Sequence, residues 1–319
     1  MKLRFQVLLV AVIFFNYSFL IAQNNNDSIQ KKSVAYIVAK FPVTRIFNIE
    51  YSNVAPYNYT GKTQNTSLPE DKVKSYQQVK ANANFYFLRK KSWVVSSNLN
   101  FRYTFIDTPT ESANESFDNQ FYSLGVTATH ISKLFDKTIT YTAIARVDAN
   151  EKSLQRMRGY VIPNMVITAN EKTKFMVGLV GIIDPSSQVP LVPLITYERK
   201  FGKNWTLDML LPQRLMLRKF VGTNSRVSLG SEIDVNSFYL EQNSQNLEFR
   251  QTDLNTGLLF EHYYKDFIFS LRGGSRSVIN SRMFLRSKSQ DDYIYDFKPE
   301  SALFFNVGIS YSPFSKLKK

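Results

Sequence analysis

The side chains best suited to acid–base catalysis are scarce in this chain, which holds two histidines and no cysteine. His130 and His262 are the groups whose ordinary pKa lies near neutrality. A hydrolytic triad needs a histidine that reaches a serine and is itself oriented by a carboxylate. Both histidines instead continue runs in which every second residue is apolar, so we expect them at strand ends or at a membrane interface. The sequence therefore favours a protein that is not an enzyme.

Metal and phosphate sites have equally little support. Without cysteine the chain offers no thiolate ligands, and its two histidines lie far apart in the sequence. Asp291 and Asp292 could contribute to a calcium site in a loop, but two adjacent carboxylates are too short a motif to predict one. Gly273-Gly274 lacks the lysine–serine pair and the following helix of a phosphate-binding loop. We expect neither a cofactor nor a metal.

Charged and amide side chains at alternate positions are the remaining candidates for chemistry. Lys80 and Asn82, for example, alternate with Val79, Ala81 and Ala83. If the apolar face of such a strand meets lipid, its polar face lines a lumen. The residues predicted to face the lumen are Lys80, Asn82, Arg102, Arg146, Asp148, Glu198, Asp208, Glu232 and Asp234. Because they carry both signs of charge, they could pair and fill the lumen, or face one another across water and act as a filter.

The elements that must position these residues are strands, because alternation of period two recurs along the whole chain. Short, mostly basic turns fall near 89–91, 133–137, 170–172, 202–204, 222–224 and 265–266. Longer polar stretches fall between them, near 54–75, 107–118, 149–157, 184–190, 241–245 and 276–300. This asymmetry is typical of outer-membrane barrels, which have tight periplasmic turns and longer outer loops.

The predicted fold is therefore all-β, a transmembrane antiparallel up-and-down β-barrel of about 14 strands. The region 204–220 allows two interpretations, because Pro212 could close a tight hairpin or bend one long strand. A bend would reduce the count to about 12, since both chain ends should face the periplasm. Trp93 and Trp205 each lie beside a short turn, and we expect them to anchor the barrel at the periplasmic interface.

The ends of the chain have a different character from its body. Lys2 and Arg4 precede an apolar run at 7–15, and Ala22 offers a small residue for cleavage, which together predict a signal peptide at 1–22. A retained anchor is disfavoured because the run is too short to span a bilayer. We expect an N-terminal periplasmic segment at 23–42, the barrel at 43–314 and a basic tail at 315–319.

The formal net charge of +14 bears on partners. An exported chain would rarely meet nucleic acid, so lipid phosphates and phosphorylated lipopolysaccharide are the acidic partners that we expect, with no nucleic acid. We also expect a monomer inserted by the barrel assembly machinery. Such barrels commonly end on an aromatic residue that this machinery reads, whereas here Phe314 is followed by five further residues.

Four stretches resemble the uncharacterised outer-membrane β-barrel families of Bacteroidota-type bacteria. They are the Ala22-Gln23 junction, "FPVTRIFNIEY", "PLITYERKFGKNWTLDMLLP" and "FFNVGISYSPF". The resemblance covers about 40–314. It implies the cell outer membrane as the location and a barrel as the fold, and it implies no reaction.

The sequence leaves several functions open. The first is a channel or facilitator for small polar solutes, and the second is a closed barrel that anchors surface loops or binds lipopolysaccharide or an envelope partner. An outer-membrane enzyme ranks third because no catalytic histidine constellation is found. A soluble periplasmic β-sandwich is the alternative fold, but it has no reason to alternate short and long connections.

Overall fold

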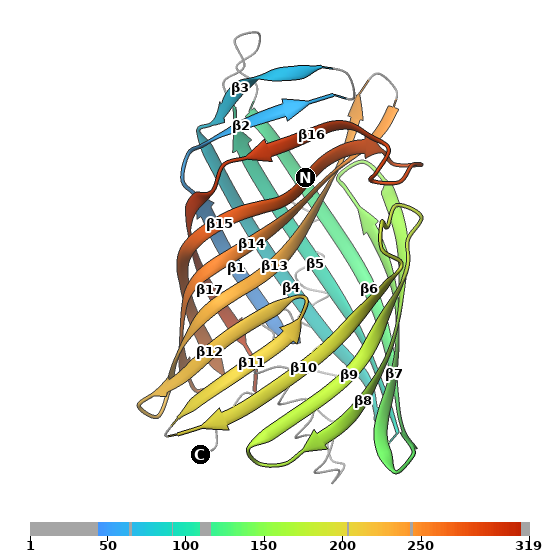
Figure 1. Ribbon diagram of the computed structural model, residues 1–319, viewed down its shortest axis with the longest axis vertical. Coiled ribbons are helices and arrows are strands. Elements are labelled where there is room, and N and C mark those ends of the chain that lie inside the picture. Colours follow the sequence, from blue (N-terminus) through green and yellow to red (C-terminus); the bar gives the residue numbers. More distant parts are fainter. Residues whose placement is uncertain are drawn as a thin grey trace, which may run out of the picture.

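The computed structural model describes residues 44–63, 66–90, 92–108, 116–202, 204–242 and 245–313. The predicted signal peptide 1–22, the segment 23–42 and the tail 315–319 lie outside the described residues. Among those described, no helix is long and apolar enough to cross a membrane. The described chain is built from β-strands (Figure 1).

Fourteen strands form the wall of a barrel. They are β1 (Phe47–Val54), β4 (Ser75–Lys90), β5 (Trp93–Asp107), β6 (Ser116–Leu134), β7 (Lys137–Ala149), β8 (Leu154–Ala169), β9 (Thr173–Ile183), β10 (Leu191–Phe201), β11 (Trp205–Leu211), β12 (Arg214–Val221), β13 (Ser225–Gln242), β14 (Gln245–Tyr264), β15 (Phe267–Leu285) and β17 (Ala302–Tyr311). Three further strands lie in the outer connections: β2 (Tyr57–Lys62), β3 (Ser67–Val73) and β16 (Tyr293–Pro299).

The wall closes on itself through antiparallel pairs. Each strand from β4 to β15 pairs with the next, β17 pairs with both β15 and β1, and β1 pairs with β4. The prediction of a 14-stranded antiparallel barrel is confirmed. Pro212 lies in the turn that joins β11 to β12, so the bend that would have given 12 strands does not occur.

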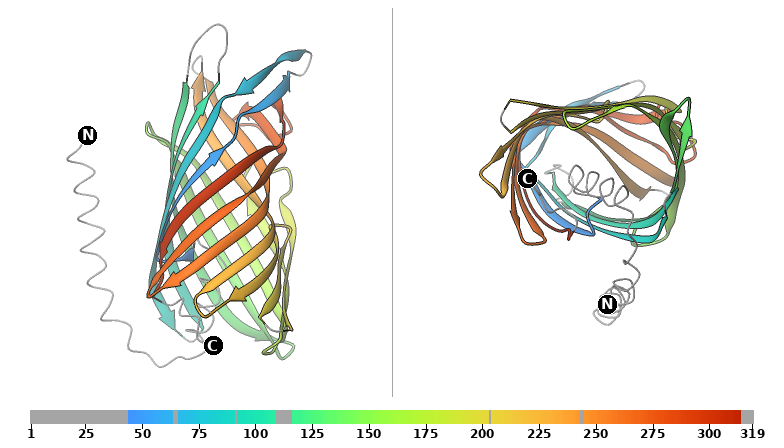
Figure 2. Two further views of the ribbon diagram at one scale, coloured as in Figure 1. Left: turned by 90° about the vertical axis from the view of Figure 1, so that its left-hand side faces the viewer. Right: turned by 90° about the horizontal axis from the view of Figure 1, so that it is seen from below.

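The two ends of the barrel differ as the spacing of the connections predicts. Tight turns join the strands at the periplasmic end, and the long connections lie at the outer end (Figures 1 and 2). Five of the six predicted loops are partly wrong. β13 ends at Gln242 and β14 begins at Gln245, so 241–245 is mostly strand, and 107–118 contains the start of β6. The stretch 54–75 contains β2 and β3, 276–300 contains the end of β15 and all of β16, and 149–157 contains the start of β8. The strands β2, β3 and β16 pair with one another and with the tip of β15 beyond the wall, and they do not need the lipid-facing apolar stripe that alternation detects.

The outer surface of the barrel is apolar and the inner surface is polar. Leu124, Leu229, Leu258, Leu271 and Val307 all have more than 40% of their side-chain surface exposed and lie on different parts of the wall. The buried residues, by contrast, include many arginines, carboxylates and amides. A closed barrel with this distribution satisfies its backbone hydrogen bonds between strands and meets lipid with apolar side chains, as a membrane-spanning barrel must.

Candidate functional site

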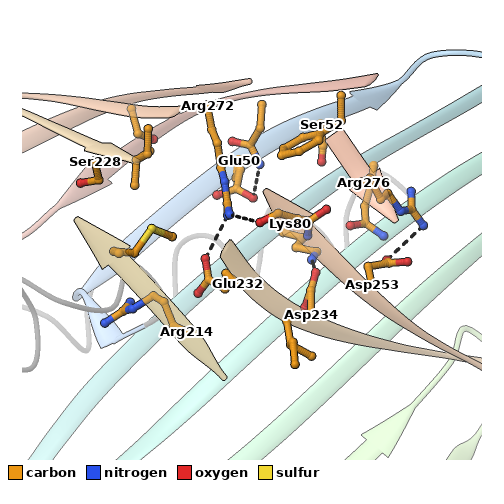
Figure 3. Close-up of a pocket in the computed structure, with 18 of the residues that line it drawn as sticks. Glu50, Ser52, Lys80, Arg214, Ser228, Glu232, Asp234, Asp253, Arg272 and Arg276 are labelled. Atoms are coloured by element: carbon orange, nitrogen blue, oxygen red, sulfur yellow. Dashed lines mark hydrogen bonds and ion pairs between the residues drawn. The ribbon is translucent and has the colours of Figure 1, made fainter. Parts of the chain in front are cut away.

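A cavity of about 210 Å³ occupies one side of the lumen. Its walls are β1, β4 and β17 on one side and β12–β15 on the other, and it is large enough to hold several waters. Five carboxylates and six basic side chains line it, together with amides and hydroxyls. Figure 3 shows Lys80 and Asp234 pointing toward each other from opposite walls of this space.

Ion pairs organise the charges of the cavity. Lys80 Nζ lies 2.5 Å from Asp234 Oδ2, which joins β4 to β13. Arg272 pairs with Glu232 at 2.9 Å, and Arg276 pairs with Asp253 at 3.0 Å. The Lys80, Asp234 and Glu232 side chains keep 25%, 39% and 27% of their surface exposed, so water reaches these pairs. The cavity is therefore polar, hydrated and close to neutral in net charge.

Two further carboxylates bind arginines closer to the periplasmic end. Glu261 is fully buried and binds Arg45 at 2.6 Å and Arg226 at 2.5 Å. Asp208, also fully buried, binds Arg218 at 2.6 Å and Arg214 at 3.1 Å. Because each carboxylate contacts two guanidinium groups, these pairs tie neighbouring strands together.

A larger network, the outer cluster, lies near the outer end of the lumen. Its members are the carboxylates Asp148, Asp184 and Glu248 and the arginines Arg146, Arg156, Arg158 and Arg250. Arg158 alone contacts all three carboxylates, at 2.7, 3.0 and 3.0 Å. The cluster joins β7 and β8 to β14 on the opposite wall, and through Asp184 it also holds the β9–β10 loop. It therefore fastens together parts of the barrel that share no strand pairing.

Asp184 is the member of the outer cluster that lies outside the strands. Burial alone would raise the pKa of its carboxyl. The amide and hydroxyl of Ser186 donate hydrogen bonds to Asp184 Oδ1, at 2.9 and 2.7 Å, and the Arg158 and Arg156 guanidinium groups lie beside it. Together these contacts lower the pKa of Asp184 to about 2.

The β9–β10 loop should therefore resist acid. A carboxyl whose pKa is lower in the folded than in the unfolded chain stabilises the fold above the unfolded pKa of about 4, and this contribution is lost as pH falls toward the folded pKa. We expect the Asp184 carboxyl to stay ionised at pH 4 and to titrate near pH 2. A carbon-13 NMR titration of the aspartates in detergent micelles measures this, with Asp292 as the exposed reference. A midpoint for Asp184 close to 4 would contradict the described contacts.

Arg102 makes a second link across the lumen. It extends from β5, only 7% exposed, and donates hydrogen bonds to Asn236 Oδ1 at 2.9 Å and to the Ser237 carbonyl of β13. Its guanidinium lies 4.6 Å from the ring centres of both Phe121 and Phe238. Next to it, Asn119 of β6 donates to the Tyr239 carbonyl at 3.5 Å. These contacts hold the outer half of β13 against the inner surface of β5 and β6.

The nine residues that the alternation placed in the lumen fall into four groups. Lys80, Asn82, Glu232 and Asp234 line the cavity. Arg102 makes the link across the lumen, and Arg146 and Asp148 belong to the outer cluster. Glu198 pairs with Lys174 at 3.5 Å, and Asp208 binds Arg214 and Arg218. A role for these residues in moving a solute stays a prediction.

Several residues of the site escaped the sequence prediction. They are Arg45, Arg156, Arg158, Asp184, Arg214, Arg218, Arg226, Glu248, Arg250, Asp253, Glu261, Arg272 and Arg276. The spacing of two between charged residues could have found some of them, because residues i and i+2 of a strand share a face. Arg156 and Arg158, and Glu248 and Arg250, fit this spacing, and Arg214 and Arg218 share a face at twice the spacing.

The tryptophans and histidines lie near the periplasmic turns. Trp93 begins β5, is 43% exposed and lies 4.6 Å from the His130 ring. Trp205 begins β11, with Lys219 Nζ 5.0 Å from its ring centre. His262 Nδ1 lies 3.0 Å from Ser225 Oγ on the barrel exterior. Among the described residues, no group of three or more histidines and carboxylates is arranged to hold a metal ion.

Comparison of sequences places the chain in a family. The model of the family described as a domain of unknown function, DUF6268, matches residues 36–312, so the chain belongs to that family. The resemblance to an uncharacterised family is confirmed to this extent, and an origin in Bacteroidota-type bacteria stays a prediction. None of the curated proteins compared with the chain matches its sequence.

Solved structures of outer-membrane barrels are distantly similar. An outer membrane channel from Pseudomonas putida F1 has a TM-score of 0.37 and 8% identity, over 82% of this chain and 94% of that one. The P. putida toluene transporter TodX has a TM-score of 0.33 and 10% identity, over 89% and 93% of the two chains. The transport unit of the Escherichia coli autotransporter AIDA-I has a TM-score of 0.33 and 11% identity, over 89% and 99%. Similarity at this level says nothing about what this barrel binds or transports.

Proposed function

We propose that this DUF6268 barrel is an outer-membrane channel for small polar solutes. The observation that carries the proposal is the hydrated cavity of about 210 Å³ inside the barrel, lined by charges of both signs. The mature chain would begin after Ala22, and the solute would pass between the wall of β1 and β4 and the wall of β12–β15.

The arrangement of charge supports a preference among solutes. Lys80 and Glu50 of one wall face Asp234, Glu232 and Arg272 near the other, so positive and negative groups alternate around the same space (Figure 3). An ion in this space is attracted by the side chains of opposite charge and repelled by those of like charge to a similar extent. A neutral or zwitterionic solute can accept and donate hydrogen bonds on both sides, and it should pass more readily than an ion of similar size.

Liposome swelling tests this proposal. Vesicles that contain the refolded mature protein should swell in isosmotic urea, glycerol or glycine faster than vesicles without protein. Swelling in raffinose should stay at the protein-free rate, because a trisaccharide is larger than the cavity. Equal rates in all solutes, with and without protein, would contradict a channel, provided that the protein is folded as judged by heat-modifiable migration on a gel.

A second candidate function is a closed barrel that presents its outer loops to lipopolysaccharide phosphates or to an envelope partner. The observation in its favour is the pair of links across the lumen, made by Arg102 and by the outer cluster. The swelling experiment separates the two candidates, since a closed barrel passes none of the solutes. A monomer inserted by the barrel assembly machinery fits either function.

A further inference from the structure

On one side of the barrel, two neighbouring wall strands are too short to cross the membrane. β11 has 7 residues and β12 has 8, fewer than the 9–11 that a strand needs to cross a membrane at a tilt. At a tilt of about 45°, seven residues rise only roughly 16 Å, against an apolar belt of about 25 Å. Figure 1 shows the β11–β12 hairpin ending far below the outer ends of β13 and β14. The wall is therefore interrupted within the thickness of the membrane.

The interruption is framed on four sides. Pairing of β10 with β11 begins at Ile195, and pairing of β12 with β13 ends at Glu232, with one more hydrogen bond from Ile233 N to Gln213 O. Beyond these points, within the described chain, β10 and β13 have no strand partner on the sides that face each other. The β9–β10 loop closes the outer side, where Arg250 of β14 donates to Ser186 Oγ at 2.8 Å. We call this opening in the strand pairing the side window.

At both strand edges of the side window, backbone groups that face the gap are either missing a donor or hydrogen-bonded, as an apolar surrounding requires. The Pro190 carbonyl, just before β10, accepts from Ile182 N of β9, and Lys200 N of β10 donates to the Lys172 carbonyl just before β9. Even-numbered residues here therefore point toward β9, so Pro193 faces the window, and proline has no N–H to leave unpaired. On β13, Ile233 bonds toward β12, so the carbonyls of Ser237 and Tyr239 face the window. These two carbonyls accept hydrogen bonds from Arg102 and Asn119 of the opposite wall.

Three glycines allow β13, β14 and β15 to approach one another closely at the same level of the barrel. Gly230, Gly257 and Gly274 are partners in register across the three strands. A Cβ added to them would lie 2.1 Å from Leu215 O, 2.1 Å from Gly273 O and 2.0 Å from Thr256 O, respectively, so only glycine fits these positions. Glycine in a strand marks a sharp bend or a close approach of backbones. This glycine crease lies on the periplasmic side of the Arg102 contacts, where a bend can bring the β13 edge against β5 and β6.

We propose that the side window is a lateral portal between the lumen and the outer leaflet, closed by Arg102 and hinged at the glycine crease. The cavity reaches its lower rim, since Gln213, Arg214, Ile233 and Asp234 line that cavity. The exterior beside it is apolar, with Leu191 and Val235 more than half exposed. A polar interior next to an apolar rim fits an amphipathic molecule with a small polar or zwitterionic head. This cargo deepens the proposed channel function, on which the route from the periplasmic side to the portal rests.

Labels at three positions test the portal in vesicles made with brominated phospholipid. The chain has no cysteine, so Gln213→Cys, Leu215→Cys and Asn306→Cys each take a single thiol-reactive fluorophore. Leu215 faces lipid, Gln213 lies on the lower rim, and Asn306 lines the cavity on β17. We expect the brominated chains to quench the label at 215 fully, at 213 substantially and at 306 weakly. Adding Arg102→Ala should raise the open population roughly tenfold and increase quenching at 213, because charge-assisted hydrogen bonds are lost.

Each outcome decides the proposal. Because Gln213 is already exposed in the β11–β12 turn, the deciding readout is the change caused by Arg102→Ala: an increase in quenching at 213 supports a portal that Arg102 holds shut, and no increase overturns it. A label at 213 as protected as the label at 306 in both backgrounds would overturn the portal. Swelling rates measured on the same vesicles distinguish the two proposals. Quenching at 213 without solute permeation would support the portal and contradict the axial channel.

Discussion

Replacing Glu248 by glutamine is expected to lower the free energy of unfolding by about 3–5 kcal/mol, the usual cost of removing one partner from a buried ion pair. Glu248 is fully buried and accepts contacts from Arg250 at 2.6 Å, Arg156 at 2.9 Å and Arg158 at 3.0 Å. Glutamine has nearly the same shape but no charge, so the three guanidinium groups would share only Asp148 and Asp184. Their mutual repulsion in the lumen then adds to the loss of the hydrogen bonds.

Urea unfolding in lipid vesicles, followed by the fluorescence of Trp93 and Trp205, measures this loss. The matched control is Glu241→Gln, because Glu241 pairs with Lys152 at 3.6 Å and both side chains are more than half exposed. An exposed pair contributes about 0–1 kcal/mol, so the control should unfold close to the wild type. A Glu248→Gln protein that unfolds like the control would show that the outer cluster does not hold the walls together.

Replacing Gly274 by alanine is expected to cost about 3 kcal/mol, near the upper end of the range for overpacking. The new Cβ would lie 2.0 Å from Thr256 O, a backbone atom of the neighbouring strand that cannot rotate away. β14 and β15 must then separate at the glycine crease, which weakens their ladder and moves the outer half of β13 away from Arg102. The same substitution should therefore raise quenching at the side window.

Gly273 provides the control on the same strand. A Cβ at Gly273 has its nearest contact at 3.8 Å, with Phe304 O, which is an ordinary separation. Gly273→Ala should leave the urea midpoint within about 0.5 kcal/mol of the wild type, as surface substitutions usually do. Equal stability of the two alanine variants would mean that the strands do not approach closely at Gly274, and the crease would be wrong.

The sequence predicted the barrel well because the barrel depends on local patterns. Each strand must present lipid with every second residue, and a hairpin brings neighbouring strands together without long-range information. Alternation thus indicated which face of β4 carries Lys80 and which face of β13 carries Asp234. It could not indicate that the two pair, because they lie 154 residues apart in the chain and meet only after the barrel has closed.

The parts that escaped prediction depend on departures from the regular pattern. The outer half of β13 is buried on both faces, so Ser237 and Tyr239 contact the opposite wall from the face that would otherwise meet lipid. Alternation assigns such residues to the exterior. The close approach of β13, β14 and β15 next to these residues depends on Gly230, Gly257 and Gly274, which come into register only through strand pairing. Arg156 was not predicted to face the lumen because the stretch 149–157 was assigned to a loop, whereas β8 already begins at Leu154.

Conductance of the refolded mature protein in a planar bilayer tests the central claim, a polar lumen that conducts, most directly. The wild type and Arg102→Ala are recorded in a salt gradient, after heat-modifiable migration has shown that both are folded. We predict stepwise openings with weak ion selectivity, because the cavity carries both signs of charge, and a higher open probability for Arg102→Ala. Silence from both folded proteins would contradict the channel and leave a closed barrel whose function lies in its outer loops.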